Sequence, residues 1–112
     1  DMGNYSAGKF ANVANFTDVA KHWSEMKGFA LGLQFSPFSP FRDDVVTSVD
    51  LDDLKTLLAD LGDAPVLADG SQGGVLAGDT DTAIAAYTSK LATARQTLQT
   101  AYGFDADNVA GW

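Results

Sequence analysis

Apolar residues that recur three and four positions apart constrain the fold of this chain more than any other feature of its sequence. The longest such series predicts a helix over residues 81–102, and its members are Ile84, Tyr87, Leu91, Ala94, Leu98 and Ala101. On an α-helix this spacing places the side chains on one face, as in a helix that packs in a bundle. Asp79 or Asp81 is suited to cap the start of this helix, and Gly103 is suited to end it.

A second series of the same kind predicts a helix over residues 16–35. Its apolar members are Val19, Trp23, Met26, Ala30 and Leu33. Asn15 or Thr17 is suited to cap the start, because short polar side chains accept hydrogen bonds from the first free amide groups. Pro37 and Pro40 follow the helix and prevent it from continuing.

A shorter helix is predicted over residues 50–61, with an apolar face formed by Leu51, Leu54, Leu57, Leu58 and Leu61. Residues 62–80 then form a loop without periodicity, and a last helical turn is expected from Asp105. No segment alternates as a strand does. The predicted fold class is therefore all-α, a bundle of about three main helices. We expect residues 1–112 to be one helical domain or the C-terminal fragment of a larger one.

The segment Phe35–Phe41 reads FSPFSPF and connects the first two predicted helices. Its two prolines favour an extended connector. Buried apolar surface stabilises a fold by about 25 cal/mol per Å², so we expect the phenylalanine rings to close the end of the core. The alternative is an exposed patch that contacts a partner.

Charge and composition exclude several classes of partner. The chain has 7 Lys and Arg against 15 Asp and Glu, which gives a formal net charge of -8 and a pI near 4.2. Such a chain repels phosphate backbones, so no nucleic-acid partner is expected. It has no cysteine for a disulfide or thiolate metal site, and no apolar run long enough for a transmembrane segment. It begins at Asp1 rather than at methionine, so we expect part of a longer parent chain to precede it.

The only histidine of the chain, His22, lies three residues before Glu25. Residues three apart share a helix face, so the imidazole and the carboxylate could reach one metal ion. Both groups are suited to iron, zinc or manganese. Two ligands do not complete a site, and a histidine hydrogen-bonded to Glu25 or to a backbone carbonyl explains the same spacing. His22 and Glu25 are thus candidate ligands of a divalent metal or iron.

Nearly opposite Val19, the same helix carries small residues four apart, namely Ser24, Gly28 and Gly32. Each interior glycine costs a helix up to about 1 kcal/mol relative to alanine. Such a strip of small residues is expected where another helix or a ligand approaches the backbone closely. We therefore expect this helix to be central in a larger bundle, completed by the rest of the parent chain or by another helical chain, including a second copy.

Three stretches resemble the C-terminal portion of imelysin-like proteins, and in particular an uncharacterised bacterial branch. They are HWSEMKGFALGLQFSPFSP (His22–Pro40), LGDAPVL (Leu61–Leu67) and AYGFDADNVAGW (Ala101–Trp112). The resemblance implies a helical bundle outside the bacterial cytoplasm, in the periplasm or at the cell surface. It also implies a link to iron uptake and a His-x-x-Glu signature, which His22 and Glu25 match.

Three functional hypotheses follow from the residues and the resemblance. The first is a non-catalytic domain of imelysin-like type that binds a metal or an iron compound through His22 and Glu25. The second is an interaction or assembly module that uses the Ser24-Gly28-Gly32 strip and the Phe35–Phe41 segment. The third is a metallopeptidase with Glu25 as ligand or general base, although the chain has no His-Glu-x-x-His pattern.

Overall fold

The computed structural model describes residues 13–44, 47–67, 69–75 and 77–111, with side chains from Thr17 onward. Over these residues the chain forms four α-helices and no strand, which confirms the all-α class. The helices are α2 (Val13–Gly32), α3 (Leu51–Leu61), α4 (Thr80–Tyr102) and α5 (Ala106–Val109). A 3-10 turn, η2 (Leu33–Phe35), continues α2.

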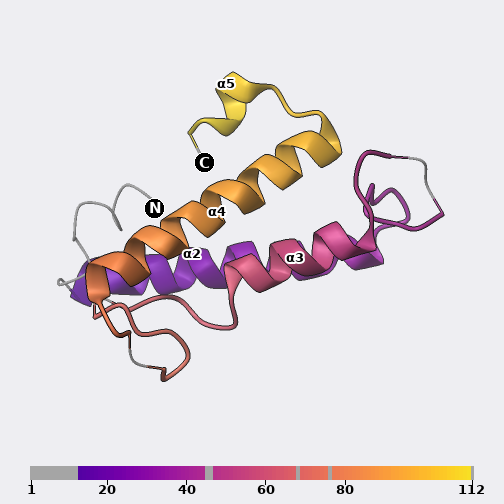
Figure 1. Cartoon of the computed structure of the whole chain (residues 1–112). Coiled ribbons are helices and arrows are strands. Elements are labelled where there is room, and N and C mark those ends of the chain that lie inside the picture. Colours follow the sequence, from indigo (N-terminus) through magenta and orange to yellow (C-terminus); the bar gives the residue numbers. More distant parts are fainter. Residues whose placement is uncertain (1–12, 45–46, 68, 76, 112) are drawn as a thin grey trace.

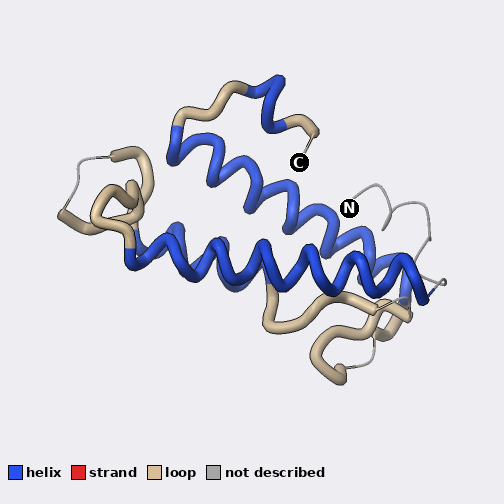
Figure 2. Tube along the Cα trace, turned by 180° about the vertical axis from the view of Figure 1, so that it is seen from behind, coloured by secondary structure: helices blue, strands red, loops and turns tan. Residues whose placement is uncertain are grey.

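The three long helices run alongside one another (Figure 1). Helix α3 runs in the opposite direction to α2 and α4 and packs against both of them. The loop between α2 and α3 lies at one end of the bundle, and the loop between α3 and α4 lies at the other (Figure 2). The short helix α5 folds back alongside α4 and buries Val109.

The main core lies where the three long helices meet. Helix α3 supplies three fully buried leucines, and Ala30 of α2 and Ala94 of α4 are buried against them. The small alanines let the helices approach, while larger side chains fill the margins of the cluster. The buried leucines of α3 are Leu54, Leu57 and Leu61. The partly buried side chains at the margin of the cluster include Met26, Leu33, Leu91 and Leu98.

A second, smaller cluster forms towards the start of α2. Val19 and Tyr87 are buried there together with Val66 of the loop between α3 and α4. Trp23 and Ile84 pack at its edge. This loop therefore contributes to the core rather than only connecting two helices.

The helix boundaries agree with the predicted ranges to within three residues. Asp79 caps α4 by accepting a hydrogen bond from the Thr82 amide at 2.7 Å, as predicted. Gly103 ends α4 in the left-handed region at φ 64°. The prediction that Asn15 or Thr17 caps the first long helix is wrong, because α2 already begins at Val13. Residues 13–15 include neither glycine nor proline, so nothing in them stops the helix from extending backwards.

Side chains of α2 and α4 converge on the last carbonyl groups of α3. Trp23 Nε1 and the Tyr87 hydroxyl both donate to the carbonyl oxygen of Leu61, at 3.0 and 3.1 Å. The Lys27 ammonium donates to the carbonyls of Leu58 and Gly62, at 2.7 and 2.6 Å. The last carbonyls of a helix have no partner inside it and carry partial negative charge. These contacts satisfy them and tie the three helices together.

The loop between α3 and α4 is held by local contacts at two glycines. Gly62 has φ +73°, and a Cβ there would lie 2.1 Å from Nε2 of Gln72, which donates to the Ala64 carbonyl at 2.7 Å. Gly70 has φ +79° and fits closely against the start of α4. The amide and hydroxyl of Ser71 donate to Asp69, and the hydroxyl bond is the main reason that the pKa of Asp69 is below its usual value.

We expect Lys27→Met to destabilise the bundle although Met keeps most of the apolar stem. Lys27 is only 14% exposed, so the carbonyls of Leu58 and Gly62 would lose charged donors with little access to water. Hydrogen bonds to charged groups contribute about 1.5–3 kcal/mol each, and part is recovered by hydration. The expected loss is about 2 kcal/mol in chemical denaturation.

Lys90→Met is the matched control, because Lys90 lies exposed on α4. It should change the free energy of unfolding by no more than about 0.5 kcal/mol. Equal effects of the two substitutions would show that Lys27 does not stabilise the end of α3.

Candidate interaction site

Helix α2 has one side packed in the bundle and one side uncovered. Val19 and Ala30 are buried, whereas Ser24, Gly28 and Gly32 are all exposed. A Cβ built at Gly28 or Gly32 would meet no atom within 4 Å. Within the described part of the chain, no neighbour therefore uses the space that the two glycines leave.

Large apolar side chains flank this glycine strip. Phe29 is 78% exposed, Leu31 is 41% exposed and Phe35 is 80% exposed. On the helical wheel, Phe29 lies on one side of the strip and Leu31 on the other. We call this surface the open face of α2, and its residues are Ser24, Gly28, Phe29, Leu31, Gly32 and Phe35.

The Phe35–Phe41 segment divides its three rings between the core and the surface. Phe41 is 1% exposed and meets Tyr102 edge to face, with ring centroids 6.3 Å apart. This ring closes the end of the core as predicted for the segment. Phe35 and Phe38 do not, since they are 80% and 90% exposed. The buried Phe41 thus agrees with rings that close the end of the core, and the exposed Phe35 and Phe38 agree with the alternative of an exposed patch.

His22 and Glu25 lie on α2 and are both exposed. Glu25 is 4.0 Å from the ammonium of Lys21, one turn earlier. The described residues contain no group of three or more His, Asp or Glu side chains that could hold a metal ion. A metal bound by His22 and Glu25 would take its further ligands from outside these residues.

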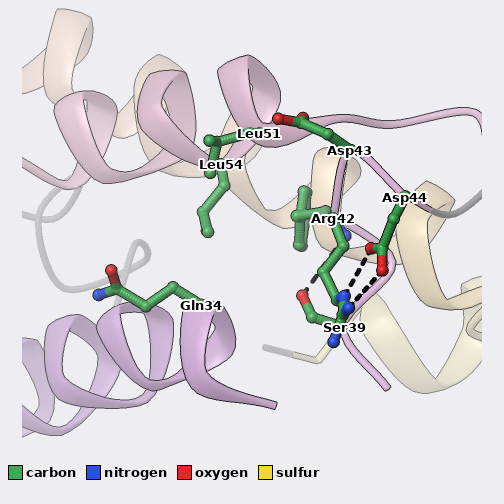
Figure 3. A pocket seen from close by; sticks show the side chains of 8 residues that line it. Gln34, Ser39, Arg42, Asp43, Asp44, Leu51 and Leu54 are labelled. Atoms are coloured by element: carbon green, nitrogen blue, oxygen red, sulfur yellow. Dashed lines mark hydrogen bonds and ion pairs between the residues drawn. The ribbon is translucent and has the colours of Figure 1, made fainter. Parts of the chain in front are cut away.

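A cavity of about 310 Å³ lies at the end of the bundle where α2 leads into α3 (Figure 3). Its walls come from η2, which continues α2, from the segment 39–44 and from the first turn of α3. Phe41 and Leu54 are fully buried beneath it, and Leu51 is 37% exposed. We call this cavity the α2–α3 pocket, and its lining residues are Gln34, Ser39, Phe41, Arg42, Asp43, Asp44, Leu51 and Leu54.

An ion pair forms part of the rim of the α2–α3 pocket. Arg42 Nε donates to Asp44 Oδ1 at 2.7 Å, and a second guanidinium nitrogen bonds the other carboxylate oxygen. This paired hydrogen bonding lowers the pKa of Asp44 below its usual value, and it raises the pKa of Arg42. Arg42 also donates to the Pro37 carbonyl at 3.4 Å, which joins the rim to the Phe35–Phe41 segment.

Sequence reasoning did not identify the α2–α3 pocket or the ion pair on its rim. The pair is close in sequence, since Arg42 and Asp44 are two residues apart after Pro40. The pocket depends on the path of the connector between α2 and α3 at the end of the bundle, and this path leaves no periodic pattern in the sequence.

None of the helices in the described residues is long and apolar enough to cross a membrane. Comparison of the chain with protein-family models, with curated proteins and with solved structures found no match.

The ion pair predicts a measurable titration of Asp44. Because the pair lowers the pKa of Asp44 in the folded chain, its stabilising effect is present above the unfolded pKa and is lost as pH falls through the folded pKa. Arg42→Gln removes the charge and the paired donors. We expect NMR titration of the Asp44 carboxyl carbon to show a higher pKa in this variant than in the wild type.

A titration of Arg95→Gln, which changes the net charge equally on α4, serves as the control and should leave the pKa of Asp44 in place. If Asp44 titrates at the same pH in the wild type and in Arg42→Gln, the ion pair does not form in solution.

Proposed function

We propose that this domain is an assembly module in which the open face of α2 docks a helix, namely α2 of a second copy. The observation that carries the proposal is the combination of unfilled space at Gly28 and Gly32 with flanking rings that are 78–80% exposed. Exposed large apolar side chains that gather on one surface are typical of interaction sites.

The shape of the open face suits a helix. Glycines four apart form a shallow groove along α2, so the backbone of a second helix can approach closely. Phe29 and Leu31 would then pack on either side of that helix. Aromatic side chains bury roughly 150–250 Å² each when they pack, so Phe29 and Phe35 would supply much of the apolar area of such a contact.

Charge supports a second copy as the occupant. The described charged groups on the uncovered side of α2 are of both signs, with Lys21 between Asp18 and Glu25. Much of the acidic excess lies elsewhere, in the segment from Asp43 to Asp53 and in the α3–α4 loop. Two copies that meet through α2 would therefore not press their acidic segments together.

We expect a variant with Gly28→Leu and Gly32→Leu to lose self-association while the monomer keeps its fold. Each new side chain would occupy open space in the monomer, and leucine favours the helix over glycine by up to about 1 kcal/mol. In the assembly the same side chains would fill the groove. Sedimentation velocity should show a dimer for the wild type and a monomer for the variant.

The matched control carries Ala85→Leu and Ser89→Leu, which add two leucines four residues apart at exposed positions of α4. It should sediment as the wild type does. A wild type that stays monomeric at several hundred micromolar contradicts docking of a second copy.

We propose metal binding through His22 and Glu25 as a second candidate function. Two observations support it: both side chains are exposed on α2, and the His-x-x-Glu spacing matches the signature of the imelysin-like proteins that the sequence resembles. A non-catalytic role in iron uptake outside the cytoplasm rests on the same resemblance. The remaining ligands would come from the parent chain or from a partner.

Calorimetry with Zn²⁺ and Fe²⁺ on the full chain, alone and with any helical partner that co-purifies with it, tests this candidate. His22→Ala should lower the affinity at least about tenfold, because imidazole is a principal ligand for both ions. Circular dichroism should show unchanged helix content, since His22 is exposed. An Asp81→Asn variant controls for the loss of one polar group on another helix. Equal affinity of the wild type and His22→Ala would remove His22 from any metal site.

A further inference from the structure

The α2–α3 pocket combines an apolar floor with an acidic surround, and the assembly of two α2 helices does not use it. Phe41 and Leu54 close its floor, with exposed fractions of 1% and 2%. Ser39 is also buried, but its hydroxyl accepts the Phe41 amide at 3.4 Å. The floor thus offers apolar contact and a polar group that already has a partner.

The surroundings of the pocket favour positive charge. Between Arg42 and Lys55 the chain carries five aspartates and only these two basic residues. Arg42 is neutralised by its paired hydrogen bonds to Asp44, and Lys55 donates to Asp52 at 2.7 Å. Asp43 lies on the pocket wall (Figure 3). An anionic ligand would meet carboxylates there and no unpaired basic side chain of the lining.

We propose that the α2–α3 pocket binds an apolar side chain of a basic peptide segment, with a lysine or arginine residue of that segment beside Asp43. A volume of about 310 Å³ is at the lower end of ligand pockets, which suits one large side chain rather than a packed helix. Phe38, which directly precedes the wall residue Ser39, is 90% exposed. Its ring is available to a cationic side chain of the same segment.

The occupant is a partner of opposite charge and not a second copy of this chain. A chain with a net charge of -8 carries few basic side chains to place beside the pocket. Opposite charge speeds encounter and selects the partner, while the buried apolar side chain supplies most of the affinity. The proposal stands whether or not α2 docks a second copy.

The test uses the full 112-residue chain and a synthetic probe, the amidated peptide Lys-Lys-Leu-Phe-Lys-Lys. In two-dimensional NMR the peptide should shift the amide signals of Ser39 and of residues 41–44 and 51–54. The acidic peptide Glu-Glu-Leu-Phe-Glu-Glu should cause no such shifts. A peptide with the same charge but no apolar centre, Lys-Lys-Gly-Ser-Lys-Lys, should bind at least about tenfold more weakly, because it has no large apolar side chain to bury in the pocket.

Two variants test the two halves of the proposal. Leu51→Arg places a positive charge in the wall and should abolish the localised shifts. Asp43→Asn should weaken binding by about two- to fivefold, as expected for one exposed ion pair, whereas Asp81→Asn on α4 should not change it. Asp43 is exposed, so this variant keeps the test valid even if Leu51→Arg unfolds.

Equal binding of the basic peptides with and without the apolar centre would overturn the proposal, since the contact would then be charge alone. Shifts that spread over all acidic segments would overturn it too. The variant with Gly28→Leu and Gly32→Leu should still bind the probe, so failure of assembly and failure of the pocket are distinguishable.

Discussion

Hydrogen bonds from Lys27, Trp23 and Tyr87 to the end of α3 fix how the three long helices lie relative to one another. The donors come from α2 and α4, and the acceptors are the carbonyls of Leu58, Leu61 and Gly62. Because a hydrogen bond tolerates little change in distance, these contacts set the position of α3 along both neighbours. The apolar clusters on the same faces then fill the space between the helices without needing further polar contacts.

Holding α3 and α4 on one side of α2 leaves its other side uncovered. Lys27 lies on the packed side, and the glycine strip lies beyond it around the helix. The same arrangement holds the connector between α2 and α3 at one end of the bundle, where Phe41 enters the core and Phe38 stays outside. The open face and the α2–α3 pocket are thus both consequences of where α3 is anchored. They differ in chemistry, since the open face is apolar and the pocket is surrounded by carboxylates.

Periodicity predicted the three long helices because a helix that is buried on one face has apolar residues three and four positions apart in its sequence. Capping chemistry predicted both ends of α4. The side chain of Asp79 caps its start, and the left-handed backbone of Gly103 ends it. The start of α2 was missed, since a possible cap at Asn15 does not prevent a longer helix and residues 13–15 contain neither glycine nor proline. The sequence also favours a loop over residues 1–15, with a helical turn near residues 9–14, and docking of Trp112. The loop prediction is wrong for residues 13–15, which are helical, and residues 1–12 and Trp112 lie outside the described residues.

The candidate site was predicted only in part. The glycine strip could be found from sequence, because spacing alone places Gly28 and Gly32 on one face. Which phenylalanine rings of the Phe35–Phe41 segment are buried could not be found from sequence, since it depends on the path of the connector in space. The role of Lys27 could not be predicted from sequence either, because the carbonyl groups that it binds are 31 and 35 residues away along the chain. Whether His22 and Glu25 bind a metal stays a prediction.

The central claim is that the open face of α2 is where this domain meets a second copy. The chain has no cysteine, so a spin label can be attached at Asp18→Cys alone, an exposed position of α2 outside the open face, with Ala59→Cys on α3 as the comparison. Pulsed dipolar spectroscopy should give a short, well-defined distance between copies for the label on α2, as expected for helices whose axes lie 8–10 Å apart. The label on α3 should give a longer one. Absence of coupling between copies, or a shorter distance from the label on α3, would contradict the claim.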